Sequence, residues 1–140
     1  MKIKIFYDNI NFRLKGSKKI RKLIEKVIRN EEKHSDDLLF IFTSNEKIRE
    51  INKEFLNHNR YTDVIAFDYS KGINIVGEIY ISIDTVKLNS NNYKVSLILE
   101  VLRVMIHGTL HLCGYEDRSE RQKKIMTGME DKWIEEYWKG

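Results

Sequence analysis

Hydrophobic and polar residues alternate with two different periods along the first half of the chain. The opening KIKIFY has isoleucine at every second position, which predicts a first strand. From residue 17 to residue 32, apolar residues recur at helical spacing after Ser17, a suitable N-cap, and predict an amphipathic helix. The run LLFIFT at residues 38–43 is typical of a central strand buried on both faces. Thr43 and Glu46 have the spacing of a capping box, so we expect a second helix to follow.

The second half continues with two strands and then only helices. Residues 62–69, TDVIAFDY, and residues 76–83, VGEIYISI, predict two strands separated by a turn at Gly72. In the second of these, isoleucine alternates with polar residues, as in a strand with one buried face. A short helix over residues 84–91 and a helix that is apolar almost all round over residues 94–112 are expected next. A last helix has apolar residues at helical spacing on one side: Met126, Met129, Trp133 and Tyr137.

The order of these elements predicts an α+β or α/β-like domain. We expect a small, mostly four-stranded mixed sheet covered by helices, with the helix at residues 94–112 buried in the middle. The chain has 140 residues, the size of one ordinary domain. No internal repeat and no linker rich in proline, glycine or serine divides it, so residues 1–140 are expected to form a single domain.

The composition is that of a globular protein, with 41% hydrophobic and 33% charged residues. No apolar run approaches the roughly 20 residues that a membrane span needs, so no membrane partner is expected. The opening segment has neither a continuous apolar region nor a small-residue cleavage site, and it does not predict a secretory signal. The single cysteine, Cys113, cannot form an internal disulfide, which favours a reducing cytoplasm.

Positive charge is concentrated in the first predicted helix. The whole chain has a net charge of +4 and a pI near 9.1, which is a mild imbalance. Between residues 15 and 30, only Glu25 opposes a group of basic residues: Lys15, Lys18, Lys19, Arg21, Lys22, Lys26 and Arg29. This side of the helix is either a solvated face or a surface that binds RNA, with Lys18, Lys19 and Lys22 as candidate phosphate contacts.

The stretch HGTLHLCGYED, residues 107 to 117, contains the strongest candidate chemistry. Side chains four apart on a helix lie one above the other, so His107 and His111 can present nitrogen atoms to one metal ion. Gly114 can adopt the left-handed conformation that ends a helix, and the chain after it can bring Asp117 back as a third ligand. The pattern H-x-x-x-H-x-x-G-x-x-D has the spacing of the metzincin zinc site, with aspartate in the last position. It predicts a site for one zinc ion per chain.

Three other positions refine this prediction. Metzincin proteases have a catalytic glutamate beside the first histidine, where this chain has Gly108, so peptidase activity is disfavoured. Cys113 is expected to point away from the ligands and to pack as a small hydrophobic residue. Glu100 lies seven residues before His107 on the same helix face, where it either orients a ligand or pairs with a basic side chain such as Arg103.

Several segments resemble the YbeY family of metal-dependent endoribonucleases. HGTLHLCGYED is similar to the family signature H-G-x-L-H-L-x-G-Y-D-H. INKEFLNHNRYTDVIAF resembles the family segment L-N-x-x-Y-R followed by P-T-D-V-L-S-F, and GEIYISID resembles the family strand G-D-I-x-I-S. The approach to the motif, E-x-x-R-x-x-x-H, also fits, so the resemblance extends over most of the chain.

This resemblance implies a role in the maturation of ribosomal RNA, particularly at the 3′ end of the small-subunit rRNA, and in ribosome quality control. It also implies a zinc ion held by three side chains, which here are His107, His111 and Asp117. Ribosomal RNA is the substrate that it suggests, with small-subunit ribosomal proteins as candidate partners.

Two positions depart from the family pattern. Asp117 occupies the place of a histidine, and aspartate oxygen also binds zinc, at roughly 2.0 to 2.2 Å. The family arginine that is thought to contact the scissile phosphate falls on Leu56, and Arg60 is the nearest replacement. Either Arg60 has taken over this contact or the nuclease activity is weakened. His58 is expected to be an ordinary exposed loop residue.

Two functions therefore remain open. In the first, the zinc site hydrolyses RNA phosphodiester bonds, Arg60 stabilises charge on the phosphorane, and the lysine-rich helix holds the RNA backbone. Asp63 and Glu78 are both candidates for the general base in this reaction. In the second, the protein is a ribosome assembly factor with a structural zinc, which binds RNA or a ribosomal protein without cleavage.

Overall fold

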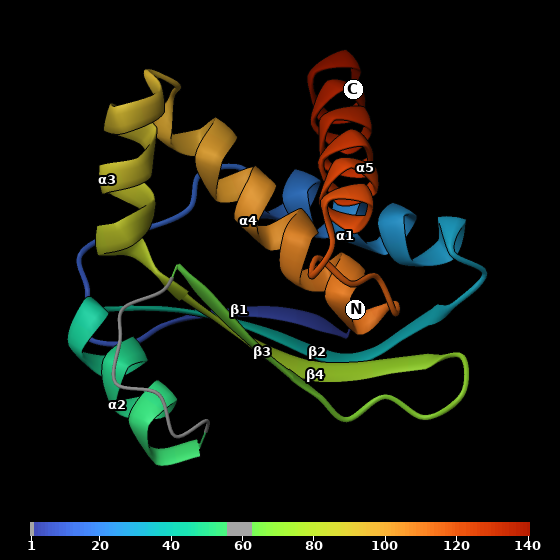
Figure 1. The fold of residues 1–140 in the computed structure, drawn as a ribbon, viewed down its shortest axis with the longest axis horizontal. Coiled ribbons are helices and arrows are strands. Elements are labelled where there is room, and N and C mark those ends of the chain that lie inside the picture. The colour runs from blue at the N-terminus through green and yellow to red at the C-terminus, as the bar shows by residue number, and fades with distance from the viewer. Residues whose placement is uncertain (1, 56–62) are drawn as a thin grey trace.

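The computed structural model describes residues 2–55 and 63–140, and this part of the chain forms one four-stranded sheet with five helices (Figure 1). The expected α+β fold is therefore confirmed. The elements in chain order are β1 (Ile3–Tyr7), α1 (Ser17–Asn30), β2 (His34–Thr43), α2 (Asn45–Phe55), β3 (Val64–Asp68), β4 (Asn74–Ser82), α3 (Ile83–Tyr93), α4 (Leu97–Leu112) and α5 (Glu120–Lys139).

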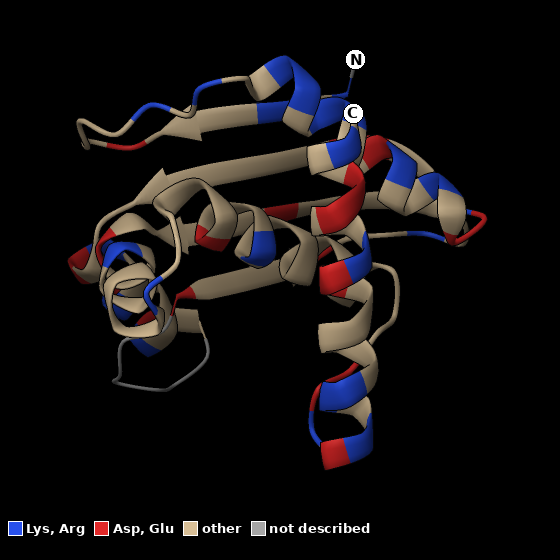
Figure 2. Ribbon diagram, turned by 90° about the horizontal axis from the view of Figure 1, so that it is seen from above, with Lys and Arg blue, Asp and Glu red and all other residues tan. Residues whose placement is uncertain are grey.

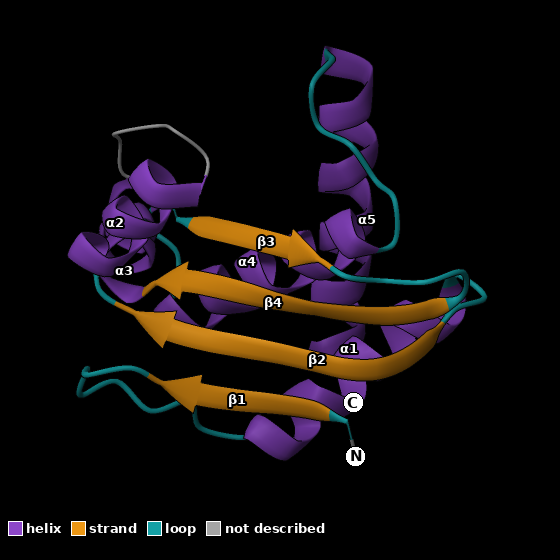
Figure 3. Ribbon diagram, turned by 90° about the horizontal axis from the view of Figure 1, so that it is seen from below, coloured by secondary structure: helices purple, strands orange, loops and turns teal. Residues whose placement is uncertain are grey.

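The sheet is mixed, with the strand order β1-β2-β4-β3 (Figure 3). β2 is parallel to both of its neighbours, β1 and β4, whereas β3 and β4 are antiparallel. Parallel neighbours need crossover connections, and α1 lies in the first of these and α2 in the second. A short turn joins β3 to β4, and Gly72 in this turn has a φ of 58°, which glycine adopts without steric cost.

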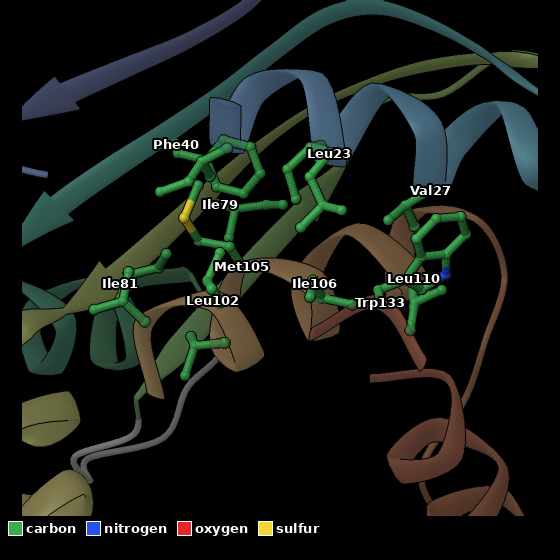
Figure 4. Packing of buried hydrophobic residues seen from close by; sticks show 14 of the residues in the cluster. Leu23, Val27, Phe40, Ile79, Ile81, Leu102, Met105, Ile106, Leu110 and Trp133 are labelled. Carbon is green, nitrogen blue, oxygen red and sulfur yellow. The ribbon is translucent and has the colours of Figure 1, made fainter. Parts of the chain in front are cut away.

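Helices cover the two faces of the sheet unequally. α1, α4 and α5 lie on one face, and α2 lies on the other (Figure 1). The main core is formed between the first face and its three helices, where side chains of α1, α4 and α5 meet those of β2 and β4 (Figure 4). Each large apolar side chain buried there contributes roughly 1.5 to 3 kcal/mol. Its fully buried members include Phe40, Ile79, Ile81, Leu102 and Met105.

The second face of β2 is less buried than the sequence pattern predicted. Phe40 and Phe42 are fully buried in the main core, but Leu39 and Ile41 on the opposite face are only half-buried. The prediction of a strand buried on both faces is therefore wrong for this face, because one short helix covers only part of it. That helix, α2, packs over β3 and β4 through a small separate cluster formed by Ile48, Ile51 and Ile65.

Several helix starts differ from their predicted positions. Ser17 is the first residue of α1 and not its N-cap, which is Gly16, and no side chain makes a capping hydrogen bond there. Ser44, and not Thr43, caps α2, because its hydroxyl accepts a hydrogen bond from the backbone N–H of the third helical residue. Thr43 still belongs to β2 and donates to a carboxylate oxygen of Asp8 at 3.1 Å. β4 ends at Ser82, whose hydroxyl caps α3, so that Ile83 begins this helix and does not end the strand.

α4 is the buried central helix that the apolar run predicted. It begins at Leu97 after an N-cap at Ser96, and its residues are buried nearly all round. α4 approaches the sheet closely at Gly108, because a Cβ atom added there would lie 2.9 Å from the Cγ2 atom of Ile79. Any larger side chain, such as the glutamate of a metzincin protease, would require the Ile79 side chain or the helix to move.

No single helix in the described part of the chain is long and apolar enough to cross a membrane. Only α3 and α4 taken together reach that length and composition, and they are bent by 119° at their junction. The apolar surface of α4 is covered by the sheet and by α1, α3 and α5.

We expect Gly108→Ala to lower the free energy of unfolding by roughly 1 to 3 kcal/mol, because the added methyl group must displace Ile79 or the helix. Gly128 in α5 provides a matched control, since a Cβ atom added there meets no neighbouring group within 4 Å. Gly128→Ala should instead raise the free energy of unfolding by up to about 1 kcal/mol. Urea unfolding measures the free energy of unfolding of both variants. If Gly108→Ala changed this free energy in the same direction as Gly128→Ala, the contact with Ile79 would not limit the side chain at position 108.

Candidate metal centre

The C-terminal end of α4 is built so that the chain turns back on the helix. Gly114 has a φ of 105°, which confirms the positive φ expected there. Its backbone N–H donates to the His111 carbonyl at 3.0 Å, and the N–H of Tyr115 donates to the Leu110 carbonyl at 3.0 Å. These two bonds form the Schellman motif that ends many helices. The turn brings Asp117 next to the histidines on the last two turns of α4.

Three acceptor atoms converge beside this turn. The Nε2 atom of His107 lies 3.0 Å from Nε2 of His111 and 3.3 Å from Oδ2 of Asp117. The third separation, from Nε2 of His111 to the same carboxylate oxygen, is 3.5 Å. Ligands at about 2.0 to 2.1 Å from a tetrahedral zinc ion lie roughly 3.3 Å apart, so the three atoms fit one such ion. In the part of the chain that the structure describes, these residues form the candidate metal-binding group.

A hydrogen-bond acceptor fixes the outward nitrogen of each imidazole. Nδ1 of His111 lies 2.9 Å from the backbone oxygen of Tyr115, an atom that can only accept. Nδ1 of His107 lies 2.6 Å from a carboxylate oxygen of Glu130. Both Nδ1 atoms therefore hold the proton when the rings are neutral, and both Nε2 atoms present a lone pair toward Asp117. Three acceptors that face one another in this way repel, and a bound cation relieves the repulsion.

Glu130 is the residue of this centre that sequence reasoning missed. It lies in α5, is 5% exposed, and accepts a hydrogen bond from Arg103 Nη1 at 3.0 Å as well as from His107. Arg103 also donates to Asp131 at 2.7 Å. A buried carboxylate that bonds to both a guanidinium and an imidazole is held in one orientation. In the sequence, Glu130 could have been noticed as an acidic residue on the buried, apolar side of the last helix.

The local charge favours the protonated form of His107. Burial lowers the pKa of the imidazole, but the hydrogen bond and charge of Glu130, together with the charges of Asp117 and Asp63, outweigh it and leave the pKa raised. The negative groups that attract a proton to this ring also attract a metal cation. The electrostatics of the centre therefore agree with its geometry.

A small cavity of about 110 Å³ lies beside the centre. It is bordered by Asp63, just before β3, and by Glu100, Arg103 and His107 of α4. Glu100 is 6% exposed, and burial raises its pKa while the charge of Arg103 partly offsets this effect. Among the described residues, its carboxylate makes no hydrogen bond to a ligand histidine. The Arg103 guanidinium instead forms ion pairs with Glu130 and Asp131, so both interpretations of Glu100 stay predictions.

The two candidate general bases lie on different faces of the sheet. Asp63 borders the cavity next to His107, and burial raises its pKa against the opposing charge of that histidine. Glu78 pairs directly with Phe67 across the antiparallel ladder, and Phe67 packs in the α2 cluster. Directly paired residues share one face of a sheet, so Glu78 faces away from α4. Of these two residues, Asp63 is the one that lies on the side of the metal centre.

The other candidate residues lie apart from the three ligand atoms. Lys18, Lys19 and Lys22 are exposed on α1, where basic residues follow one another along the helix (Figure 2). Cys113 is half-buried and packs against the main core, and burial raises the pKa of its thiol to about 12. It is therefore a packed thiol, as the sequence predicted.

Three of the residues considered in the sequence, Leu56, His58 and Arg60, lie outside the described residues. The contact of Arg60 with a scissile phosphate therefore stays a prediction. So does the role of His58 as an ordinary loop residue.

The fold and the centre together define a class of protein, an α+β domain with a candidate three-residue metal site at the end of its core helix. The family model described as endoribonuclease YbeY matches residues 6–138 of the chain. The chain belongs to the endoribonuclease YbeY family, which confirms the resemblance seen in its motifs.

Curated relatives and a solved structure agree with this assignment. Proteins named endoribonuclease YbeY from Christiangramia forsetii and Flavobacterium psychrophilum are 40% and 41% identical, over 92% and 90% of this chain and 90% of each relative. One from Azobacteroides pseudotrichonymphae is 43% identical over 80% of this chain and 81% of the relative. The solution structure of a Thermotoga maritima protein has a TM-score of 0.68 and 30% identity, and the match covers 97% of this chain and 89% of that one.

We expect Glu130→Ala to weaken the binding of added zinc by roughly 10- to 100-fold, the usual effect of removing the outer partner of a ligand histidine. Without this carboxylate, the Nδ1 proton of His107 loses its acceptor and the ring can turn away. Glu135→Ala is a matched control on the same helix, because the Glu135 side chain is 68% exposed. Competition with a zinc chelator measures the affinity of each variant. Equal affinities for the two variants would show that Glu130 does not hold the histidine in place.

Proposed function

We propose that this chain is a zinc-dependent endoribonuclease that hydrolyses phosphodiester bonds of single-stranded RNA at the centre formed by His107, His111 and Asp117. The observation that carries this proposal is the convergence of three acceptor atoms, two Nε2 atoms and a carboxylate oxygen, while the outward Nδ1 atom of each ring is held by a hydrogen-bond acceptor. Two imidazoles and one carboxylate are a usual ligand set for zinc, with one ion per chain. When bound, zinc supplies Lewis-acid polarisation of a phosphate oxygen or of the attacking water. Membership of the endoribonuclease YbeY family supports RNA as the substrate.

Asp63 is the residue that we propose takes the proton from the attacking water. It borders the same cavity as His107, on the side of the sheet that contains the metal centre. Burial raises the pKa of its carboxyl above the usual aspartate value. A pKa closer to neutral makes a carboxylate a stronger proton acceptor at physiological pH.

Cations from two other segments complete the proposal. Arg60 would stabilise the charge on the phosphate during cleavage, in place of the family arginine at the position of Leu56, because a guanidinium can bind phosphate through two parallel hydrogen bonds. Lys18, Lys19 and Lys22 on α1 would hold the RNA backbone through charge alone. All three lysines are exposed, and within the described part of the chain none of them forms an ion pair. Both observations support a role in binding RNA phosphates.

The biological setting that we propose is the maturation of small-subunit ribosomal RNA at its 3′ end, with a part in ribosome quality control. It is the role that the sequence resemblance implied, and family membership supports it. The proposed compartment is the cytoplasm, and small-subunit ribosomal proteins are the proposed protein partners. A ribosome assembly factor with a structural zinc would use the same three ligands without cleaving RNA.

One preparation of the protein can test binding and chemistry together. We expect about one zinc ion per chain by elemental analysis, and cleavage of a single-stranded RNA that has the sequence of a small-subunit rRNA 3′ end. The double variant His107→Ala with His111→Ala should lose both properties. Arg60→Ala should keep its zinc and lose cleavage by roughly 100-fold or more, because its contact would act mainly in the transition state. Lys87→Ala, exposed on α3, is the matched control for the removal of a surface cation.

Two results would contradict this account in different ways. Full zinc occupancy without any cleavage by the unmodified protein would overturn the nuclease proposal and favour the assembly factor. Cleavage that survives in the double histidine variant would show that the chemistry takes place elsewhere on the chain.

A further inference from the structure

A groove of about 560 Å³ lies at the opposite end of α4 from the metal ligands. We call it the aromatic groove, and its walls come from the loop before α1, the start of α4 and the end of α5. Its lining includes Phe12, Lys15, Leu97, Ile98, Tyr137 and Trp138. Ten residues of α4 separate Leu97 from His107, which corresponds to roughly 15 Å along the helix axis. The groove is therefore distinct from the cavity at the candidate metal centre.

The groove presents an aromatic side chain that the fold does not need to bury. Trp138 is 55% exposed, whereas Trp133 on the same helix is 6% exposed and packs in the main core. The ring of Trp138 contacts that of Tyr137 edge-on, with 5.1 Å between the centroids. Leu97 and Ile98 are half-buried and add apolar surface to the groove. An exposed indole over an apolar floor is a suitable surface for stacking a planar ligand.

Positive charge borders the same groove. Lys15 is exposed at its edge, and the ammonium group of Lys19 lies 4.3 Å from the ring centroid of Tyr137. A neighbouring cavity of about 200 Å³ shares Tyr137 and is lined by Lys19, Lys22 and Lys26 against one acidic residue, Glu136. Figure 2 shows that Lys and Arg residues follow one another along the loop before α1 and along α1, beside the C-terminal end of α5. The aromatic groove therefore combines a surface for stacking with positive charge beside it.

We propose that the aromatic groove binds a nucleotide of single-stranded RNA, with the base stacked on Trp138 and the adjoining phosphates on Lys15 and Lys19. This inference rests on the proposed function, which makes RNA the substrate, and adds an anchoring site away from the metal ligands. Every base has an aromatic face, so such stacking tolerates any sequence while lysines attract the backbone. An acidic peptide would satisfy the lysines but would leave the indole and the apolar floor uncovered, and RNA is the better match for both features.

Tryptophan fluorescence of the zinc-loaded protein provides the test. A 2′-O-methyl oligoadenylate, which keeps an RNA-like backbone, should quench the emission of the unmodified protein. Trp138→Phe should abolish most of this quenching, because the remaining indole of Trp133 is buried. In fluorescence anisotropy of a dye-labelled oligonucleotide, which does not depend on a tryptophan reporter, Trp138→Ala should weaken binding by between about fivefold and a hundredfold, the effect of losing one stacked base. Lys15→Ala should reduce the slope of log affinity against log salt by about 0.7.

Matched controls come from α3, where Tyr93 is 67% exposed and Lys87 is also exposed. Tyr93→Ala and Lys87→Ala should leave both the affinity and the salt dependence unchanged. The proposal fails if Trp138→Ala binds the oligonucleotide as tightly as Tyr93→Ala. It also fails if a polyglutamate peptide competes for the groove as well as the oligonucleotide does, since the surface would then be a site for acidic peptides.

The same measurements separate this inference from the proposed function. If the unmodified protein cleaves RNA but oligonucleotide binding does not depend on Trp138, the groove proposal alone is wrong. If binding depends on Trp138 but no RNA is cleaved, the nuclease proposal is wrong and the anchoring site stands.

Discussion

The centre of this protein depends on three acceptor atoms that the fold holds close together and that repel one another when both imidazole rings are neutral. Two imidazole nitrogens and a carboxylate oxygen lie 3.0 to 3.5 Å apart, and each presents a lone pair to the others when the rings are neutral. A backbone carbonyl and a carboxylate accept hydrogen bonds from the outward nitrogens, so both neutral rings keep their Nε2 lone pairs turned toward the centre. Such local cost persists where the surrounding fold over-determines the geometry, and it is typical of functional sites. A metal cation bound between the three atoms would relieve their repulsion, and this favours its binding.

Two helices that meet at the centre, α4 and α5, hold the ligand side chains in this geometry. Arg103 and His107 are four apart on α4, and both bind the buried carboxylate of Glu130 on α5. The position of α4 itself depends on its close contact with β4, where the absence of a side chain at Gly108 leaves room for Ile79. Because Arg103, His107, Gly108 and His111 lie on consecutive turns of α4, a change in the packing of this helix would move the metal-binding histidines.

The sequence predicted the parts of this centre that depend on local spacing. His107, His111 and the turn at Gly114 follow from helix geometry, and the buried core helix follows from its apolar composition. Glu130 could not be found in this way, because its contact with α4 depends on how α5 packs across that helix. The half-buried second face of β2 has the same origin, since periodicity does not say which strands α2 covers. The cap at Ser44 differed by one residue because neighbouring Ser and Thr hydroxyls are equivalent in sequence.

The most direct test of this account is X-ray absorption at the zinc edge on protein loaded with one equivalent of zinc. The account predicts two imidazole nitrogens at about 2.0 to 2.1 Å and a carboxylate oxygen at about 2.0 to 2.2 Å. It also predicts no sulfur, because the Cys113 thiol packs against the core. A sulfur shell at about 2.3 Å, or a single imidazole in place of two, would contradict the central claim that His107, His111 and Asp117 converge on one metal ion.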